Sequence, residues 1–133
     1  IIKKLINADI LIKHAKVSIL GLTFKENVPD IRNTKVYDVI VELEKYGITP
    51  TVIDPYANED EVMHEYRIKL SSFDDLKGSD AIVFAVNHKE YMSINYKFID
   101  SMFKNQSKKI LFDIKGIFDI KELKERKYDF WRL

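Results

Sequence analysis

Residues 81–86 read Ala-Ile-Val-Phe-Ala-Val, an unbroken run of apolar side chains. A short run of this kind is typical of a strand that is covered on both faces, as the strands of parallel sheets are. Three further short runs are mainly apolar and also predict strands, at residues 17–22, 51–53 and 110–113. Residues 128–131 are expected to close the sheet.

Helices are predicted between these strands. The clearest begins after Thr34, which we expect to cap it, and carries apolar residues at three- and four-residue spacing until Gly47 ends it. Strands that alternate with helices form parallel sheets with right-handed crossovers, so the sequence predicts an α/β fold. Shorter segments complete the pattern, with helices expected at 58–65, 72–76, 95–104 and 118–125 and a minor strand at 68–70.

The predicted sheet also indicates where a ligand would bind. In parallel α/β sheets ligands lie at the carboxyl ends of the strands, near the point where the strand order reverses. Four segments follow the ends of predicted strands and are therefore candidate rims of a site, at residues 23–34, 54–57, 87–88 and 113–117.

Length and composition narrow the class of protein. The chain has 133 residues, enough for one domain, and 46% of them are hydrophobic and 32% charged, as in soluble globular proteins. The net charge of +1 argues against a nucleic-acid partner, which would require a basic excess. Because there is no cysteine, disulfides, thiolate metal sites and cysteine nucleophiles are excluded within the chain, which is compatible with a cytoplasmic protein.

The amino-terminal residues 1–13 are apolar but are interrupted by charged side chains. A membrane span needs about 20 mostly apolar residues, and a signal peptide needs a small-residue cleavage site, so we expect neither here. The segment is interpreted as a helical lead-in, and the chain is expected to start inside a longer protein.

The loop 23–34 holds the residues best suited to bind a charged ligand. Lys25 offers a point charge for a phosphate, Arg32 offers a planar fork of donors, and Phe24 could cover a base or a sugar face. On residue types alone, a solvated loop in which Asp30 and Arg32 pair with each other remains the simpler alternative. Lys115, which follows the strand 110–113, could likewise meet a phosphate or lie in a plain turn.

Two other kinds of site are not expected. The histidines at 14, 64 and 88 show no metal-ligand spacing, and His88 could be a rim residue or could cap the next helix. A dinucleotide site needs the spacing G-x-G-x-x-G, but Gly21 is followed by Leu22, Thr23 and Phe24. We therefore expect no metal site and no self-contained NAD site.

The loop and its flanks resemble a known family. Residues 21–34, GLTFKENVPDIRNT, match the pattern G-x-x-F-K-x-x-x-x-D-x-R-x-[ST] of the UDP-glucose/GDP-mannose dehydrogenase family. The landmarks DPY at 54–56, AVNHKEY at 85–91 and FDIKG at 112–116 follow in the family's order, so the resemblance extends from about Lys16 to the end. It is closest in character to the UDP-N-acetylmannosamine and UDP-N-acetylgalactosamine(-uronate) dehydrogenases, because Lys115 stands where the UDP-glucose branch usually has arginine.

The resemblance implies a fold and an activity. It implies a Rossmann-like three-layer sandwich with a mostly parallel sheet, in which residues 1–14 are the tail of a long central interdomain helix and residues 15–133 are the UDP-sugar-binding domain. Full-length members are NAD-dependent UDP-sugar 6-dehydrogenases, which oxidise the C6 alcohol to a carboxylate through a cysteine and serve bacterial polysaccharide synthesis. NAD is bound mainly by an amino-terminal domain that has no counterpart here, so no catalytic residue is expected in this chain.

Residue by residue, the resemblance makes Phe24, Lys25 and Lys115 substrate contacts and makes Arg32 a contact to NAD. It assigns no role to His88. The implied partner is a UDP-sugar, and binding to nucleic acid or to a membrane is not expected. The full-length protein is expected to be cytoplasmic and to form a homodimer or a higher homo-oligomer. A stand-alone nucleotide-binding domain, or a regulatory or interaction domain on the same fold, is the alternative.

Overall fold

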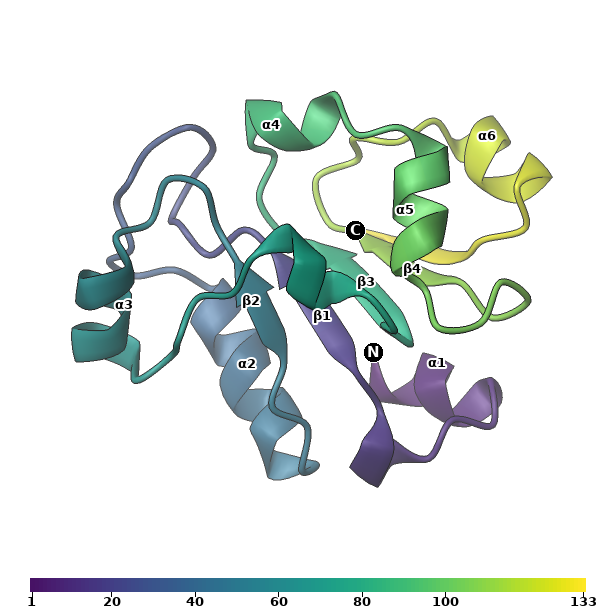
Figure 1. Cartoon of the computed structure of the whole chain (residues 1–133), viewed down its shortest axis with the longest axis horizontal. Helices are drawn as coiled ribbons and strands as arrows, with labels where there is room; N and C mark the ends of the chain where they lie inside the picture. Colours follow the sequence, from purple (N-terminus) through teal and green to yellow (C-terminus); the bar gives the residue numbers. More distant parts are fainter.

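A computed structural model describes all residues 1–133 as one five-stranded sheet with helices on both faces (Figure 1). All the paired strands are parallel, and their order across the sheet is β2-β1-β3-β4-β5. In chain order the strands are β1 (Val17–Leu20), β2 (Thr51–Ile53), β3 (Ala81–Phe84), β4 (Ile110–Asp113) and β5 (Asp129–Arg132). The predicted α/β fold is confirmed, and the sheet is parallel throughout rather than mostly parallel.

The helices form the two outer layers of the sandwich. One face of the sheet packs against α1 (Ile2–Asn7), α2 (Val36–Lys45) and α3 (Glu59–Tyr66). The other face packs against a 3-10 helix (Phe73–Leu76), α4 (Lys89–Met92), α5 (Tyr96–Met102) and α6 (Ile120–Glu125). A further 3-10 helix spans Ile12–His14. The three-layer arrangement predicted from the sequence is therefore present.

Two hydrophobic clusters hold the layers together. Successive side chains of a strand point to opposite faces, so Ile19 and Val83 join one cluster while Leu20 and Phe84 join the other. Leu20 pairs with Ile53 on one side and with Phe84 on the other. The carboxyl ends of these three strands therefore meet at one edge of the sheet.

The amino-terminal helix is shorter than predicted. It ends at Asn7, because Asp9 takes a left-handed conformation with φ 57°. The amide of Asp9 donates to the carbonyl of Ile6 and the amide of Ile10 to that of Leu5, at 3.0 Å each, which is the Schellman ending of a helix. The buried Leu5 and the partly buried Ile10 belong to the same hydrophobic cluster, which ties both ends of the turn to the core. A continuous helix over residues 1–13 was a wrong expectation.

Two smaller expectations also change. The minor strand expected at residues 68–70 does not form. The segment is joined to β2 only by a hydrogen bond that follows it, from the amide of Ser71 to the carbonyl of Val52 at 2.8 Å. Thr34 does not occupy the capping position of α2, which is held by Lys35, although the Thr34 hydroxyl accepts a hydrogen bond from the amide of Val36 at 3.2 Å.

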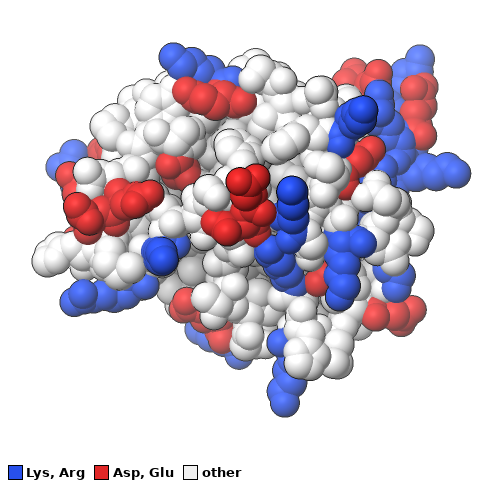
Figure 2. Space-filling model, in the orientation of Figure 1, with Lys and Arg blue, Asp and Glu red and all other residues white.

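The surface carries both signs of charge. On the face drawn in Figure 2, basic and acidic side chains are interspersed. No helix of the fold combines the length and the apolar character that crossing a membrane requires.

Candidate functional site

The strand order places a topological switch point between β1 and β3. From β1 the chain runs outward to β2, and from β2 it crosses back to β3 on the other side of β1. In such sheets the crevice outside the carboxyl ends of the two central strands is the usual ligand site. The loops that leave β1 and β3 at this point, residues 21–34 and 85–88, contain two of the four predicted rims, 23–34 and 87–88.

Gly21 allows these two loops to approach each other closely. Its φ is +101°, a conformation that side-chain-bearing residues rarely adopt. A Cβ atom at this position would lie 2.5 Å from Cβ of Val86 and 2.8 Å from the amide nitrogen of Val86. The backbone after β3 passes directly against Gly21, which explains why the motif 21–34 begins with a glycine.

Asp54 ties the end of β2 to the loop that follows β1. Its Oδ2 accepts hydrogen bonds from the amides of Leu22 (2.7 Å) and Thr23 (3.0 Å), and its Oδ1 accepts from the amides of Tyr56 (2.8 Å) and Ala57 (3.1 Å). Burial alone would raise the pKa of this carboxyl, but hydrogen bonds from His88 and these amides outweigh burial and hold the pKa at about 2. Asp54 is thus an ionised structural anchor, not a proton donor.

His88 completes this anchor. Its Nε2 lies 2.8 Å from Oδ2 of Asp54, and both side chains are fully buried, with 0% of either exposed. The ring packs against that of Tyr56, with centroids 4.8 Å apart. His88 occupies the N-cap position of α4 in the predicted rim after β3, but its side chain makes no capping bond and is buried instead of lining the rim. His14 and His64 are exposed.

The loop 23–34 presents its charged residues to solvent. Lys25 is exposed and makes no ion pair. The Arg32 guanidinium is 83% exposed and pairs with Asp30, through Nε at 3.0 Å and Nη2 at 3.2 Å. Hydrogen bonds from Arg32 lower the pKa of the Asp30 carboxyl. The ion pair between Asp30 and Arg32, which was the simpler alternative, is therefore present. Lys25 remains an unpaired cation of the loop.

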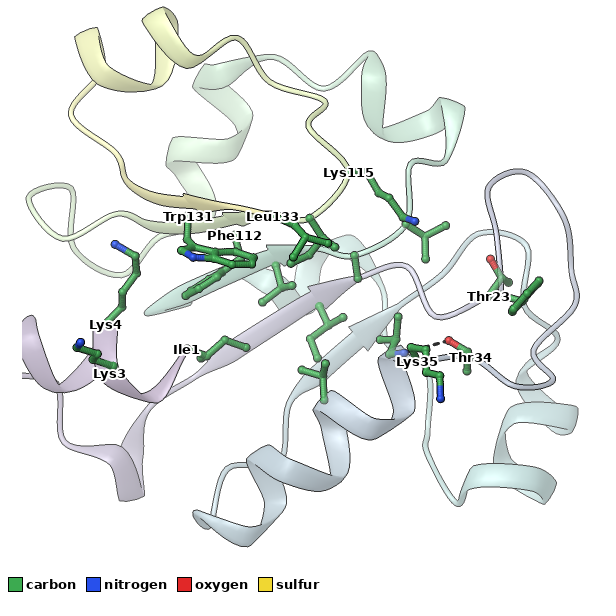
Figure 3. Close-up of a pocket in the computed structure, with 18 of the residues that line it drawn as sticks. Ile1, Lys3, Lys4, Thr23, Thr34, Lys35, Phe112, Lys115, Trp131 and Leu133 are labelled. Carbon is green, nitrogen blue, oxygen red and sulfur yellow. Dashed lines mark hydrogen bonds between the residues drawn. The ribbon is translucent and has the colours of Figure 1, made fainter.

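A cavity of about 910 Å³ opens beside the carboxyl ends of the strands (Figure 3). Its floor is the sheet face between α1 and α2, formed by apolar residues such as Val83, Phe112 and Trp131. Phe24 and Lys115 line the cavity, together with Thr23, Thr34 and Lys35. In Figure 3 the amine of Lys115 points toward the side of the cavity where Thr23 and Thr34 lie. Lys3, Lys4 and Asn7 of α1 also line it, so polar groups surround a mainly apolar floor, as is typical of small-molecule sites.

The predicted site residues do not all share this cavity. Lys25, next to Phe24 in the loop, is not part of its wall. Arg32 lines a second, more polar hollow of about 500 Å³ that it shares with Asn33 and Tyr37. Thr34 and Lys35 border both hollows, so these two residues separate the Arg32 side of the loop from the Phe24 side.

The turn that carries Lys115 is shaped by a buried carboxylate. Asp113 accepts hydrogen bonds from the amides of Ile117 (2.9 Å) and Phe118 (3.1 Å) and from the guanidinium of Arg132 (2.8 Å). Gly116 has a φ of +69°, which lets the chain turn back within this short segment. Lys115 therefore projects from a fixed turn at the end of β4.

The fold and the crevice define a doubly wound α/β domain with a ligand site at its switch point. Residues 18–120 match the profile described as the UDP-glucose/GDP-mannose dehydrogenase family, UDP binding domain. The chain belongs to this family. It is 42% identical over its whole length to Protein CapL of Staphylococcus aureus, and 36% identical over 119 residues to a UDP-N-acetyl-D-glucosamine 6-dehydrogenase of Pseudomonas aeruginosa.

The chain spans only part of these relatives. It covers 30% of Protein CapL and 28% of the Pseudomonas enzyme, while 100% and 90% of the chain itself is matched. In structure it resembles an NDP-N-acetyl-D-galactosaminuronic acid dehydrogenase from Methanosarcina mazei, with a TM-score of 0.85 at 20% identity, over 98% of this chain and 27% of that one. At that identity the likeness supports the fold alone.

Sequence reasoning missed the buried pair of Asp54 and His88. Both lie in landmarks that carried the resemblance, DPY and AVNHKEY, and 54–57 and 87–88 were predicted rims. No local pattern pairs them, because they are 34 residues apart and meet only when β2 and β3 flank β1.

Proposed function

We propose that this chain binds the nucleotide part of a UDP-sugar in an NAD-dependent UDP-sugar 6-dehydrogenase, which oxidises the sugar C6 alcohol to a carboxylate. The observation that carries the proposal is the position of the motif 21–34, which lies at the switch-point crevice and holds Lys25 there as an unpaired cation. Relatives named as UDP-N-acetyl-D-glucosamine and UDP-N-acetyl-D-mannosamine dehydrogenases support it.

Three residues are proposed to bind the substrate. The exposed ammonium groups of Lys25 and Lys115 stand on two loops of the same rim, where they could neutralise the diphosphate from two sides. The Phe24 ring is 55% exposed although it borders the cavity, so it offers an apolar surface for a base or a sugar. Binding by two cations and one ring would hold the nucleotide without any covalent step in this chain.

Arg32 is proposed to contact NAD. It is the one charged side chain of the motif whose exposed fork lies in the second hollow, away from the cavity that Phe24 and Lys115 line. Its Nε and Nη2 bond to Asp30, and Nη1 makes no hydrogen bond within the chain, so a donor is available for a phosphate. The glycine spacing of a dinucleotide site is missing, so this residue would assist a cofactor held mainly by other parts of the full-length protein.

The oxidation itself needs a thiol that this chain does not possess. We therefore place the nucleophile outside the chain, and assign to residues 15–133 the binding of substrate. Residues 1–14 are proposed to be the end of the central interdomain segment, with α1 (Ile2–Asn7) as the last turns of its helix. The full-length enzyme is proposed to be a cytoplasmic homodimer or higher homo-oligomer that acts on an N-acetylated UDP-sugar in bacterial polysaccharide synthesis.

Calorimetric titration of the 133-residue chain tests the proposal. We expect it to bind UDP and UDP-N-acetylglucosamine, and Lys25→Ala to weaken binding by about 1.5–3 kcal/mol, the usual value for a hydrogen bond to a charged group. Lys97→Ala is the matched control, because Lys97 is an exposed lysine on α5, on the opposite face of the sheet. If the folded chain bound neither ligand, the alternative of an interaction domain would replace the proposed function.

A further inference from the structure

The conformation of the substrate loop depends on a buried histidine that has no assigned role. His88 Nδ1 lies 3.0 Å from the backbone amide of Asn27, which donates to it. A nitrogen that accepts a hydrogen bond carries no proton, so the ring is the neutral tautomer with its proton on Nε2. That proton is directed at Oδ2 of Asp54, 2.8 Å away.

This arrangement is not a catalytic relay. In a nucleophile–histidine–carboxylate triad the nucleophile and the carboxylate face opposite ring nitrogens. Here the hydroxyl of Thr23 (3.2 Å) and the carboxylate of Asp54 both face Nε2, and the Thr23 hydroxyl donates instead to the carbonyl of Lys25 at 2.9 Å. His88 and Asp54 are also fully buried. Whatever His88 contributes must act through the groups that it holds.

Those groups are in the turn that carries Lys25. Asn27 is bonded twice to the segment after β3, since its amide donates to His88 and its Oδ1 accepts from the amide of Lys89 at 2.9 Å. It has a φ of +60°, which asparagine tolerates better than most residues. Thr23, at the other end of the turn, is bonded to Asp54. Residues 23–27 are thus fixed at both ends, with Lys25 in the middle.

We propose that His88 is a positioning residue of the nucleotide-sugar site: its Nδ1 bond to the Asn27 amide holds residues 23–27 in the conformation that presents Lys25 to the ligand. The identity of the ligand rests on the proposed function, but the positioning does not. A turn held in its binding conformation before the ligand arrives loses less conformational entropy on binding, which is how a buried residue without ligand contact raises affinity.

Two substitutions separate the two bonds of the ring. An asparagine amide reaches about as far as Nδ1 and a glutamine amide about as far as Nε2. His88→Asn therefore keeps an acceptor for the Asn27 amide but removes the side-chain donor to Asp54, which keeps only its backbone donors. His88→Gln keeps the side-chain donor to Asp54 but leaves the Asn27 amide without an acceptor. Since Asp54 is the buried charge, we expect His88→Asn to lower stability in urea more than His88→Gln does.

The affinity for UDP is expected to change in the opposite order. His88→Gln should weaken UDP binding about 3- to 10-fold, the effect of one lost neutral hydrogen bond, and His88→Asn should stay within about twofold of the wild type. A purely structural role predicts that affinity follows stability, so that His88→Asn binds worst. That result, or equal affinities in both variants, would overturn the proposal.

Hydrogen exchange of the Asn27 amide gives a test that needs no ligand. We expect exchange to be faster in His88→Gln than in the wild type and nearly unchanged in His88→Asn, and equal exchange in all three would refute the positioning role. If the wild type binds no UDP, this measurement still decides the role of His88 while the proposed function fails. Should a His88 variant not fold, exchange in the wild type decides instead. The Asn27 amide donates to His88, whereas the amides of Lys25 and Glu26 make no hydrogen bond within the chain, so the Asn27 amide should exchange more slowly than those two. Equal exchange of the three amides would refute the positioning role.

Discussion

Substitution of Gly21 by alanine should destabilise the domain more than the same change at any other glycine. The methyl group would lie 2.5 Å from Cβ of Val86 and 2.8 Å from its amide nitrogen, which is closer than such atoms approach in proteins. The atoms that would have to move are the backbone and the short, branched side chain of Val86 in the segment after β3, not the end of a flexible side chain.

Two contributions add up at this position. A positive φ costs a residue with a Cβ about 1–2 kcal/mol, and overpacking of a tight contact costs about 1–3 kcal/mol. We therefore expect Gly21→Ala to lower the free energy of unfolding by about 2–5 kcal/mol, a large share of the roughly 5–15 kcal/mol that domains of this kind possess.

Urea denaturation of Gly21→Ala and Gly47→Ala in parallel provides the assay. Gly47 also has a positive φ, +83°, but a Cβ there would meet no atom within 4 Å, so this variant loses only the conformational part, about 1–2 kcal/mol. The difference between the two variants measures the contact between the loops after β1 and β3. Equal destabilisation would show that these loops are not in close contact, and the description of the crevice would be wrong.

Three further predictions concern charge and chemistry. The pKa of Asp54 in the folded state, about 2, is lower than its ordinary value of 3.8, so this carboxylate stabilises the fold above about pH 4 and the stabilisation is lost as the pH falls toward 2. Urea titrations of the wild type and of Asp54→Asn at pH 5 and pH 2 test this. The free energy of unfolding of the wild type should fall by about 2 kcal/mol more over this range than that of Asp54→Asn. An equal fall in both proteins would contradict the prediction. Arg32→Ala should leave the melting temperature and the UDP affinity of the chain unchanged, because the Arg32 side chain is exposed and bonds only to Asp30. In the full-length enzyme the same change should raise the apparent KM for NAD+. Loss of UDP binding would mean that Arg32 faces the substrate. Because the chain has no cysteine, it should produce no NADH with any UDP-sugar in a spectrophotometric assay, and measurable turnover would place the nucleophile within these residues.

Much of the fold was predictable because it depends on short-range patterns. The apolar runs at 17–22, 51–53, 81–86 and 110–113 predicted four strands that the structure contains, each slightly shorter or of equal length. Helix α2 ends near Gly47 as predicted, since a positive φ there completes a Schellman turn, with the amide of Ile48 donating to the carbonyl of Leu43 at 3.1 Å. The same turn at Asp9 was missed, because aspartate adopts this conformation less often than glycine and the apolar pattern continues past it.

The sequence by itself determined the α/β class, the family and the loop 23–34, because each of these is written in residue types at fixed local spacing. Only the tertiary structure decided which of those residues meet. It placed Phe24 and Lys115 on one cavity and Arg32 on another hollow, and it joined the buried Asp54 and His88 to the backbone of Asn27 in one hydrogen-bonded network. His88 lies 34 residues from Asp54 and 61 from Asn27, so no local pattern could relate them. They come together because crossing from β2 over β1 to β3 brings the carboxyl ends of all three strands to one edge of the sheet.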